Sequence, residues 1–171
     1  HKADCRYQFD LQQRGELPLR VTHNDTKLNN VLLDERTMKG LCVIDLDTVM
    51  PGLSAHDFGD TVRFGANDCR EDEEDQSKVH FLPQLYRVCE RGFLSQAGEV
   101  LTAREKEVLR WGAKLMTLEC GMRFLTDYLQ GDVYFKIARP DQNLDRARTQ
   151  FTLVQQMEAC WDELAPEESK L

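Results

Sequence analysis

The chain has 171 residues, 41% of them hydrophobic, and carries 22 lysines and arginines against 30 aspartates and glutamates. This length and apolar content suit one folded domain with a buried core and argue against a disordered chain. The formal net charge of −8 disfavours nucleic acid and anionic membranes as partners, and no apolar run approaches the roughly 18 residues that span a bilayer.

The first part of the chain is predicted to hold the end of a helix followed by short strands. Residues 1–17 are expected to form the tail of a helix that ends near Gly15. Short strands are predicted at 19–22, 30–34 and 41–45. The polar turn between the last two strands predicts a hairpin.

The pattern changes to helix after the Pro-Gly pair at 51–52. A short helix is predicted over 55–64. The acidic run 71–75 is predicted to be the solvated start of a helix that continues to Gln96, since carboxylates favour the positive end of the helix dipole.

Two further helices are predicted in the last part of the chain. Thr102 and Glu105 have the spacing of a capping box, which opens a long helix to about Gln130. A last helix is predicted over 144–164 with a core-facing stripe at helical spacing that consists of Leu153, Met157, Trp161 and Leu164. Together the elements predict an α+β fold, mostly α, with a short β-hairpin region followed by a helical block.

Six cysteines lie far apart along the chain and form no Cys-x-x-Cys pair. Zinc sites need closely spaced ligands, and secreted disulfide scaffolds are smaller and richer in cysteine. The first residues show no charged-then-apolar leader. We therefore predict free cysteines and a cytoplasmic location.

One stretch carries the residue types that chemistry requires. His23, Asp25 and Asn30 stand in the order His-x-Asp-x-x-x-x-Asn, and Asp45 ends the next predicted strand 15 positions after Asn30. Phosphoryl transfer to a hydroxyl needs one carboxylate beside the attacking group. It also needs a second carboxylate and an amide oxygen to hold Mg²⁺, which prefers hard oxygen ligands.

Residues 22–34 and 43–63 resemble the catalytic half of the aminoglycoside phosphotransferase and choline kinase group, which shares the protein-kinase-like fold. Those enzymes carry His-Gly-Asp-x-x-x-x-Asn and then a strand ending in Ile-Asp. The present Thr-His-Asn-Asp-Thr-Lys-Leu-Asn-Asn, Ile-Asp-Leu-Asp-Thr-Val-Met-Pro-Gly and Asp-Phe-Gly-Asp-x-x-Arg are most similar to the subgroup related to N-acetylhexosamine 1-kinase, as are residues 123–135. The resemblance implies Mg²⁺, ATP as co-substrate, and a small-molecule acceptor such as a sugar or amino sugar.

The resemblance also implies roles for individual residues. It makes Asp25 the catalytic base or hydroxyl-orienting residue, and Asn30 and Asp45 the ligands of Mg²⁺. His23 would brace the loop by hydrogen bonding. Lys27 would stabilise charge on the transferring phosphoryl group or would be an ordinary surface lysine.

The tripeptide Asp-Phe-Gly at 57–59 spells the metal-binding motif of protein kinases, but it follows a Pro-Gly loop and not a strand. We therefore interpret Asp45 as the counterpart of that metal ligand. Asp57 is predicted to be a buried brace that accepts backbone N–H bonds from the catalytic loop. Arg63 is expected to pair with Asp57 or Asp60 on the same short helix.

The acceptor is expected to lie between the catalytic loop and the helical block. Arg123, Asp127 and Tyr134 are the candidate substrate-binding residues, because a sugar site uses planar hydrogen-bonding groups and an aromatic face. The alternative for each of them is a residue on a helix surface. Trp111 and Phe124 are predicted to belong to the core.

The resemblance gives a domain organisation in which residues 1–171 form one domain, a kinase-like C-terminal lobe. Its parts are the helix tail at 1–17, the catalytic loop, metal-binding strand and brace at 19–65, and a helical, acceptor-binding block at 70–171. No Gly-rich phosphate loop precedes the catalytic motif, and the family places its nucleotide lobe N-terminal to it. The N-terminal nucleotide lobe is therefore expected to be absent, and the chain to be a fragment that is inactive alone.

Two other functions stay open at this point. A choline or aminoglycoside kinase would need acidic and aromatic groups around its cationic acceptor, and Asp127, Asp132 and Tyr134 are of those types. A non-catalytic kinase-like binding module would need no nucleotide lobe. The complete set of Asp25, Asn30 and Asp45 argues against that module.

Overall fold

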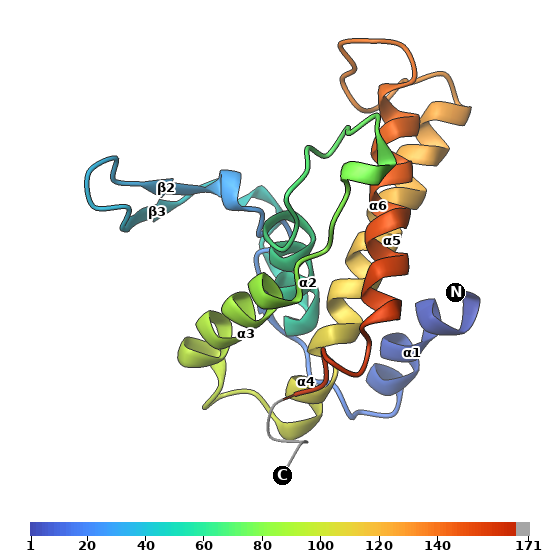
Figure 1. Ribbon diagram of the computed structural model, residues 1–171. Helices are drawn as coiled ribbons and strands as arrows, with labels where there is room; N and C mark the ends of the chain where they lie inside the picture. The colour runs from blue at the N-terminus through green and yellow to red at the C-terminus, as the bar shows by residue number, and fades with distance from the viewer. Residues whose placement is uncertain (167–171) are drawn as a thin grey trace.

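Short antiparallel strand pairs lie beside a block of helices in the computed structural model, which describes residues 1–166 (Figure 1). This arrangement confirms the predicted α+β, mostly α fold. None of the helices within these residues is long and apolar enough to cross a membrane.

The strands form two separate pairs. β1 (Arg20–Thr22) pairs with β4 (Met50–Gly52), and β2 (Val31–Leu33) pairs with β3 (Gly40–Val43). The second pair is the predicted hairpin, which projects away from the helices (Figure 1). Sequence patterns did not predict β4, because its three residues include a proline and a glycine and show no alternation.

Most of the predicted helices are present with shifted ends. α1 (Lys2–Gln13) and α2 (Ser54–Gly65) match the predicted segments closely. The capping box of Thr102 and Glu105 is confirmed, but the helix that it opens breaks at Val108 into α4 (Ala103–Glu107) and α5 (Leu109–Leu129).

The helix predicted to start at the acidic run is wrong. Residues 71–75 form turns, and α3 (Pro83–Ala97) begins only at a proline in its first turn, after the short 3₁₀ helix η3 (Gln76–Lys78). The reason is electrostatic, because Glu71 pairs with Arg63 and Arg146, and Asp72 with Arg139, so the two carboxylates do not lie on a solvated helix end.

α6 (Gln142–Ala159) lies beside α5, and both helices run along one side of the molecule (Figure 1). Its predicted core stripe is largely confirmed, since Leu153 and Met157 are buried, and Leu164 is buried beyond the helix end. Trp161 is partly buried and packs against this core.

α2 packs against both α3 and α5 and thereby centres the core. Phe58 of α2 is fully buried and meets the ring of Tyr86 of α3 edge-on, with the ring centroids 5.5 Å apart. The hydrophobic core thus fixes the helix that carries Asp57.

Two glycines permit the close approach of α2 and α5. A Cβ atom on Gly112 would lie 1.9 Å from the carbonyl oxygen of Ala55, and one on Gly59 would lie 2.3 Å from the carbonyl oxygen of Gly112. The two backbones are therefore in direct contact, and no side chain fits between them.

We predict that Gly112→Ala destabilises the protein by about 1–3 kcal/mol, because the added methyl group forces two packed helices apart. The free energy of unfolding, measured by urea denaturation, tests this expectation. Gly92→Ala in α3 is the matched control, since a Cβ at Gly92 meets no atom within 4 Å. Alanine should stabilise that helix by about 0.5–1 kcal/mol. Equal stabilities of the two variants would contradict the expectation.

Candidate functional site

The loop between β1 and the 3₁₀ helix η1 (Leu28–Asn30) is held by Asp57, in the first turn of α2. The Oδ2 and Oδ1 atoms of Asp57 accept the backbone N–H groups of His23 and Asn24, each at 2.8 Å. The Thr26 hydroxyl also donates to the Asp57 carbonyl oxygen. These are the donors expected of a brace, so the backbone of the loop follows the position of α2.

Asn24 occupies the position at which the motif of the resembling enzymes has glycine. Its φ of 62° is left-handed, a conformation that asparagine tolerates better than most residues. The side chain accepts a hydrogen bond from the Thr22 hydroxyl and donates one to the Thr48 carbonyl oxygen, both at 2.9 Å. The departure from glycine therefore keeps the turn and adds two side-chain hydrogen bonds.

His23 connects the loop to the strand that leads to Asp45. Its Nε2 lies 3.1 Å from the Ile44 carbonyl oxygen, and its own carbonyl oxygen accepts a hydrogen bond from the Thr48 hydroxyl. Its buried Nδ1 has no hydrogen-bond partner among residues 1–166. These contacts are those of a residue that positions the loop.

Asp25 is a half-buried carboxylate with two donors on one oxygen. Lys27 Nζ and Asn30 Nδ2 each lie 2.8 Å from its Oδ2. Burial acts to raise the pKa of Asp25, but the hydrogen bonds from Lys27 and Asn30 outweigh it, and the pKa lies below its ordinary value. Asp25 is therefore ionised at neutral pH and is suited to orient a hydroxyl group by accepting its hydrogen.

Asn30 and Asp45 stand close to each other across the hairpin. The backbone N–H of Ile44, the residue before Asp45, donates to the Asn30 carbonyl oxygen at 2.9 Å. The Asn30 amide nitrogen donates to Asp25, so its amide oxygen remains available as a ligand. Asp45 is exposed, and its left-handed φ of 62° turns the chain away from the direction of β3. One amide oxygen and one or two carboxylates form a donor set of hard oxygens that fits Mg²⁺.

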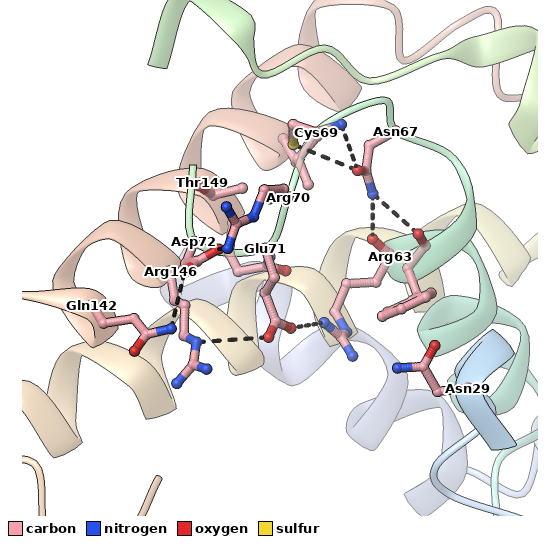
Figure 2. Close-up of a pocket in the computed structure, with 13 residues that line it drawn as sticks. Asn29, Arg63, Asn67, Cys69, Arg70, Glu71, Asp72, Gln142, Arg146 and Thr149 are labelled. Atoms are coloured by element: carbon pink, nitrogen blue, oxygen red, sulfur yellow. Dashed lines mark hydrogen bonds and ion pairs between the residues drawn. The ribbon is translucent and has the colours of Figure 1, made fainter. Parts of the chain in front are cut away.

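Arg63 does not pair with Asp57. Its Nε lies 2.8 Å from Asp60 Oδ1 and its Nη1 lies 3.0 Å from Glu71 Oε1. Figure 2 shows Glu71 between Arg63 of α2 and Arg146 of α6, whose Nε lies 3.8 Å from the second carboxylate oxygen. Glu71 of the acidic run therefore joins α2 and α6 and lies between these two helices.

Asp127 is buried, at 3% exposure, and its carboxylate is committed to the protein. It accepts the backbone N–H groups of residues 133, 134 and 135 and the Asn143 side-chain amide, at distances of 2.8–3.0 Å. We interpret Asp127 as a residue that positions the loop after α5, which carries Tyr134.

The loop and the helical block enclose a cavity of about 580 Å³ next to Asp25. Arg123 and Tyr134 line this cavity, whereas Asp127 does not. The guanidinium carbon of Arg123 lies 5.9 Å from the ring centroid of Tyr134 and 5.5 Å from that of Phe135. The cavity thus combines a carboxylate, planar donors and aromatic rings, which is a suitable lining for a sugar.

Sequence reasoning missed several residues of the cavity wall, among them Glu71, Phe135, Lys136 and Arg146. Phe124, predicted to belong to the core, is buried at 4% exposure and also reaches the wall. These residues are brought together by contacts between distant segments, which no local spacing reveals. The aromatic pair that precedes Lys136 was the only local signal for that part of the wall.

Residues 3–90 match the model of the phosphotransferase enzyme family. The match extends over slightly more than half of the chain, from α1 into α3, and contains the loop of residues 23–30, Asp45 and Asp57. It does not reach Arg123 or Tyr134, so it bears on the type of reaction and not on the acceptor. The chain belongs to the phosphotransferase enzyme family.

Proposed function

We propose that the chain is the C-terminal, catalytic lobe of an ATP- and Mg²⁺-dependent kinase that phosphorylates a hydroxyl of a sugar or amino sugar. The observation that carries this proposal is the ionised Asp25, fixed on a braced loop at the wall of a cavity with aromatic and hydrogen-bonding groups. Family membership supports the phosphotransferase class. The cavity supports a small acceptor.

In this mechanism, Asp25 accepts a hydrogen bond from the acceptor hydroxyl. This hydrogen bond orients a lone pair of the hydroxyl oxygen toward the phosphoryl group. Since its pKa is held low, Asp25 contributes mainly by orientation and takes the proton late. Lys27, at 2.8 Å from Asp25, supplies positive charge next to the reacting oxygens. Asn30 and Asp45 would hold Mg²⁺, which neutralises phosphate charge when bound.

We further propose that a nucleotide-binding lobe covers the strand region of this chain and completes the enzyme. The strands and the 3₁₀ helix η2 (Leu46–Thr48) expose an unusual number of large apolar side chains: Leu19, Val21, Leu32, Leu41, Val43, Ile44, Leu46, Val49 and Met50. A concentration of exposed large apolar side chains in one region of the chain is typical of a contact site. Without that lobe, the chain is expected to be inactive.

The non-catalytic binding module is the weaker alternative. A degenerate kinase lobe would have no reason to keep Asp25, Asn30 and Asp45 together with the hydrogen bonds that hold them.

We place the protein in the cytoplasm, which fits six free cysteines.

We predict that Asp25→Asn lowers the rate of phosphate transfer by about 10²–10⁴-fold in the full-length enzyme, because the amide cannot accept the proton. The assay measures transfer from ATP to N-acetylglucosamine, other hexoses and choline. Glu99→Gln makes the same charge change at an exposed site remote from the loop and should retain full activity. A rate of phosphate transfer by Asp25→Asn that equals the wild-type rate, with any acceptor, would refute the assignment.

Asp45→Asn is expected to raise the Mg²⁺ concentration needed for half-maximal activity by about tenfold or more, because the amide loses the charge that attracts the cation. Asp47→Asn, two residues further along and also exposed, should change this concentration much less. A magnesium titration of both variants at saturating ATP separates them. A larger increase in this Mg²⁺ concentration for Asp47→Asn than for Asp45→Asn would make Asp47 the ligand.

Lys27→Met should move the acid limb of the kcat/KM profile to higher pH. The Lys27 hydrogen bond is the largest interaction that lowers the pKa of Asp25, and the burial that raises this pKa remains after its removal. Asp25 would then become protonated, and activity would be lost, at a higher pH than in the wild type. Lys39→Met on the exposed hairpin is the control. An unchanged acid limb would show that Asp25 does not govern it.

A further inference from the structure

We propose that the acceptor carries an anionic group, a carboxylate or a phosphate ester on a sugar, which Arg123 and Lys136 bind in the cavity next to Asp25. This inference rests on the proposed function, because it names the class of acceptor for the same site. A site for an anionic acceptor differs from a site for a cationic acceptor such as choline.

The cavity wall has an excess of positive charge. Five cationic and two anionic side chains line it, in a chain whose formal net charge is −8: Lys27, Arg63, Arg123, Lys136 and Arg146 against Asp25 and Glu71. Burial raises the pKa of Cys120, which also lines the cavity, to about 11, so this thiol adds no negative charge. The cavity is therefore cationic on an acidic protein.

Both carboxylates of the wall are already engaged by cations. Asp25 Oδ2 lies 2.8 Å from Lys27 Nζ. Glu71 lies 3.0 Å from Arg63 Nη1 and 3.8 Å from Arg146 Nε. Neither carboxylate is free to neutralise an additional positive charge brought in by a ligand.

Arg123 and Lys136 are the cations of the wall that make no ion pair with any residue in the described range 1–166. Arg123 lies over the rings of Tyr134 and Phe135, and both cationic side chains belong to exposed residues. An unpaired guanidinium and an unpaired ammonium on one cavity wall are the groups that recognise a carboxylate or phosphate.

The backbone that carries Lys136 is fixed in place. Arg146 Nη1 donates to the Lys136 carbonyl oxygen at 3.1 Å, and Asp127 accepts the N–H groups of the three preceding residues. Arg123 projects from the middle of α5. The two cations are thus carried on rigid supports, and an anion bound between them would have a defined position relative to Asp25.

The same charge distribution disfavours choline and aminoglycosides. Their cationic groups would meet the two unpaired cations Arg123 and Lys136, and the carboxylates within the wall, Asp25 and Glu71, are paired. The rings of Tyr134 and Phe135 can pack on the apolar face of a sugar. An acidic or phosphorylated sugar therefore satisfies both the charge and the shape of the wall.

The test is calorimetric titration of this 171-residue chain at low ionic strength. The ligands are glucuronate and glucose 6-phosphate, which distinguish carboxylate from phosphate ester, then glucose, N-acetylglucosamine, glucosamine and choline. At least one anionic sugar should bind tenfold or more tightly than the neutral sugars, and glucosamine and choline should bind most weakly. Affinity for the anionic sugar should fall as salt is added.

Arg123→Gln and Lys136→Gln should each weaken binding of the anionic sugar by about 10- to 100-fold, the usual range for a lost charge-assisted hydrogen bond. Neither variant should change the affinity for glucose. Arg36→Gln and Lys39→Gln remove the same charges from the exposed hairpin turn and serve as matched controls, which should bind like the wild type.

Three outcomes would overturn the inference: neutral sugars that bind as tightly as their acidic counterparts, no binding of either anionic sugar, or unchanged binding by both cavity variants. An ATP titration of the full-length enzyme adds a fourth, since loss of ATP binding by the two cavity variants with intact anionic-sugar binding would assign the two cations to the nucleotide. Asp25-dependent phosphate transfer to a neutral sugar would leave the proposed function in place and remove only this inference.

Discussion

The contact between α2 and α5 at Gly59 and Gly112 is the constraint on which the rest of the structure depends. It brings two helix backbones together without intervening side chains and so sets the position of α2 in the core. α2 carries Asp57, whose carboxylate holds the backbone of the loop at His23 and Asn24. The position of Asp25 therefore follows from a helix crossing through two hydrogen bonds, and the precision of the site comes from packing.

The electrostatics of the site also depend on three carboxylates at or beside the cavity, each of which has a cationic, amide or N–H partner inside the protein. Asp25 has Lys27, Glu71 has Arg63, and Asp127 has three backbone N–H groups and an amide. Paired carboxylates remain ionised when half-buried. The remaining cations then determine which ligands the cavity attracts. The cavity wall carries an excess of positive charge, whereas the net charge of the whole chain is negative.

Sequence reasoning predicted what depends on local pattern. The capping box at Thr102 and the β2–β3 hairpin are specified within a few residues, and both are confirmed. The order of His23, Asp25 and Asn30 identified the loop for the same reason. The acidic run was misread because Glu71 takes its partners from α2 and α6, far away in the sequence. The positive cavity wall could not be predicted, since its five cations come from five separate segments.

The asparagine at position 24 changes how the loop behaves before any ligand arrives. Glycine in a left-handed turn leaves the unfolded and partly unfolded chain many alternative conformations, whereas asparagine has fewer to lose. The hydrogen bonds of Asn24 to Thr22 and Thr48 tie the turn to strand β1 and to the 3₁₀ helix η2. Less ordering then remains to be done when a ligand binds, so a larger share of the interaction energy is expressed as affinity and orientation.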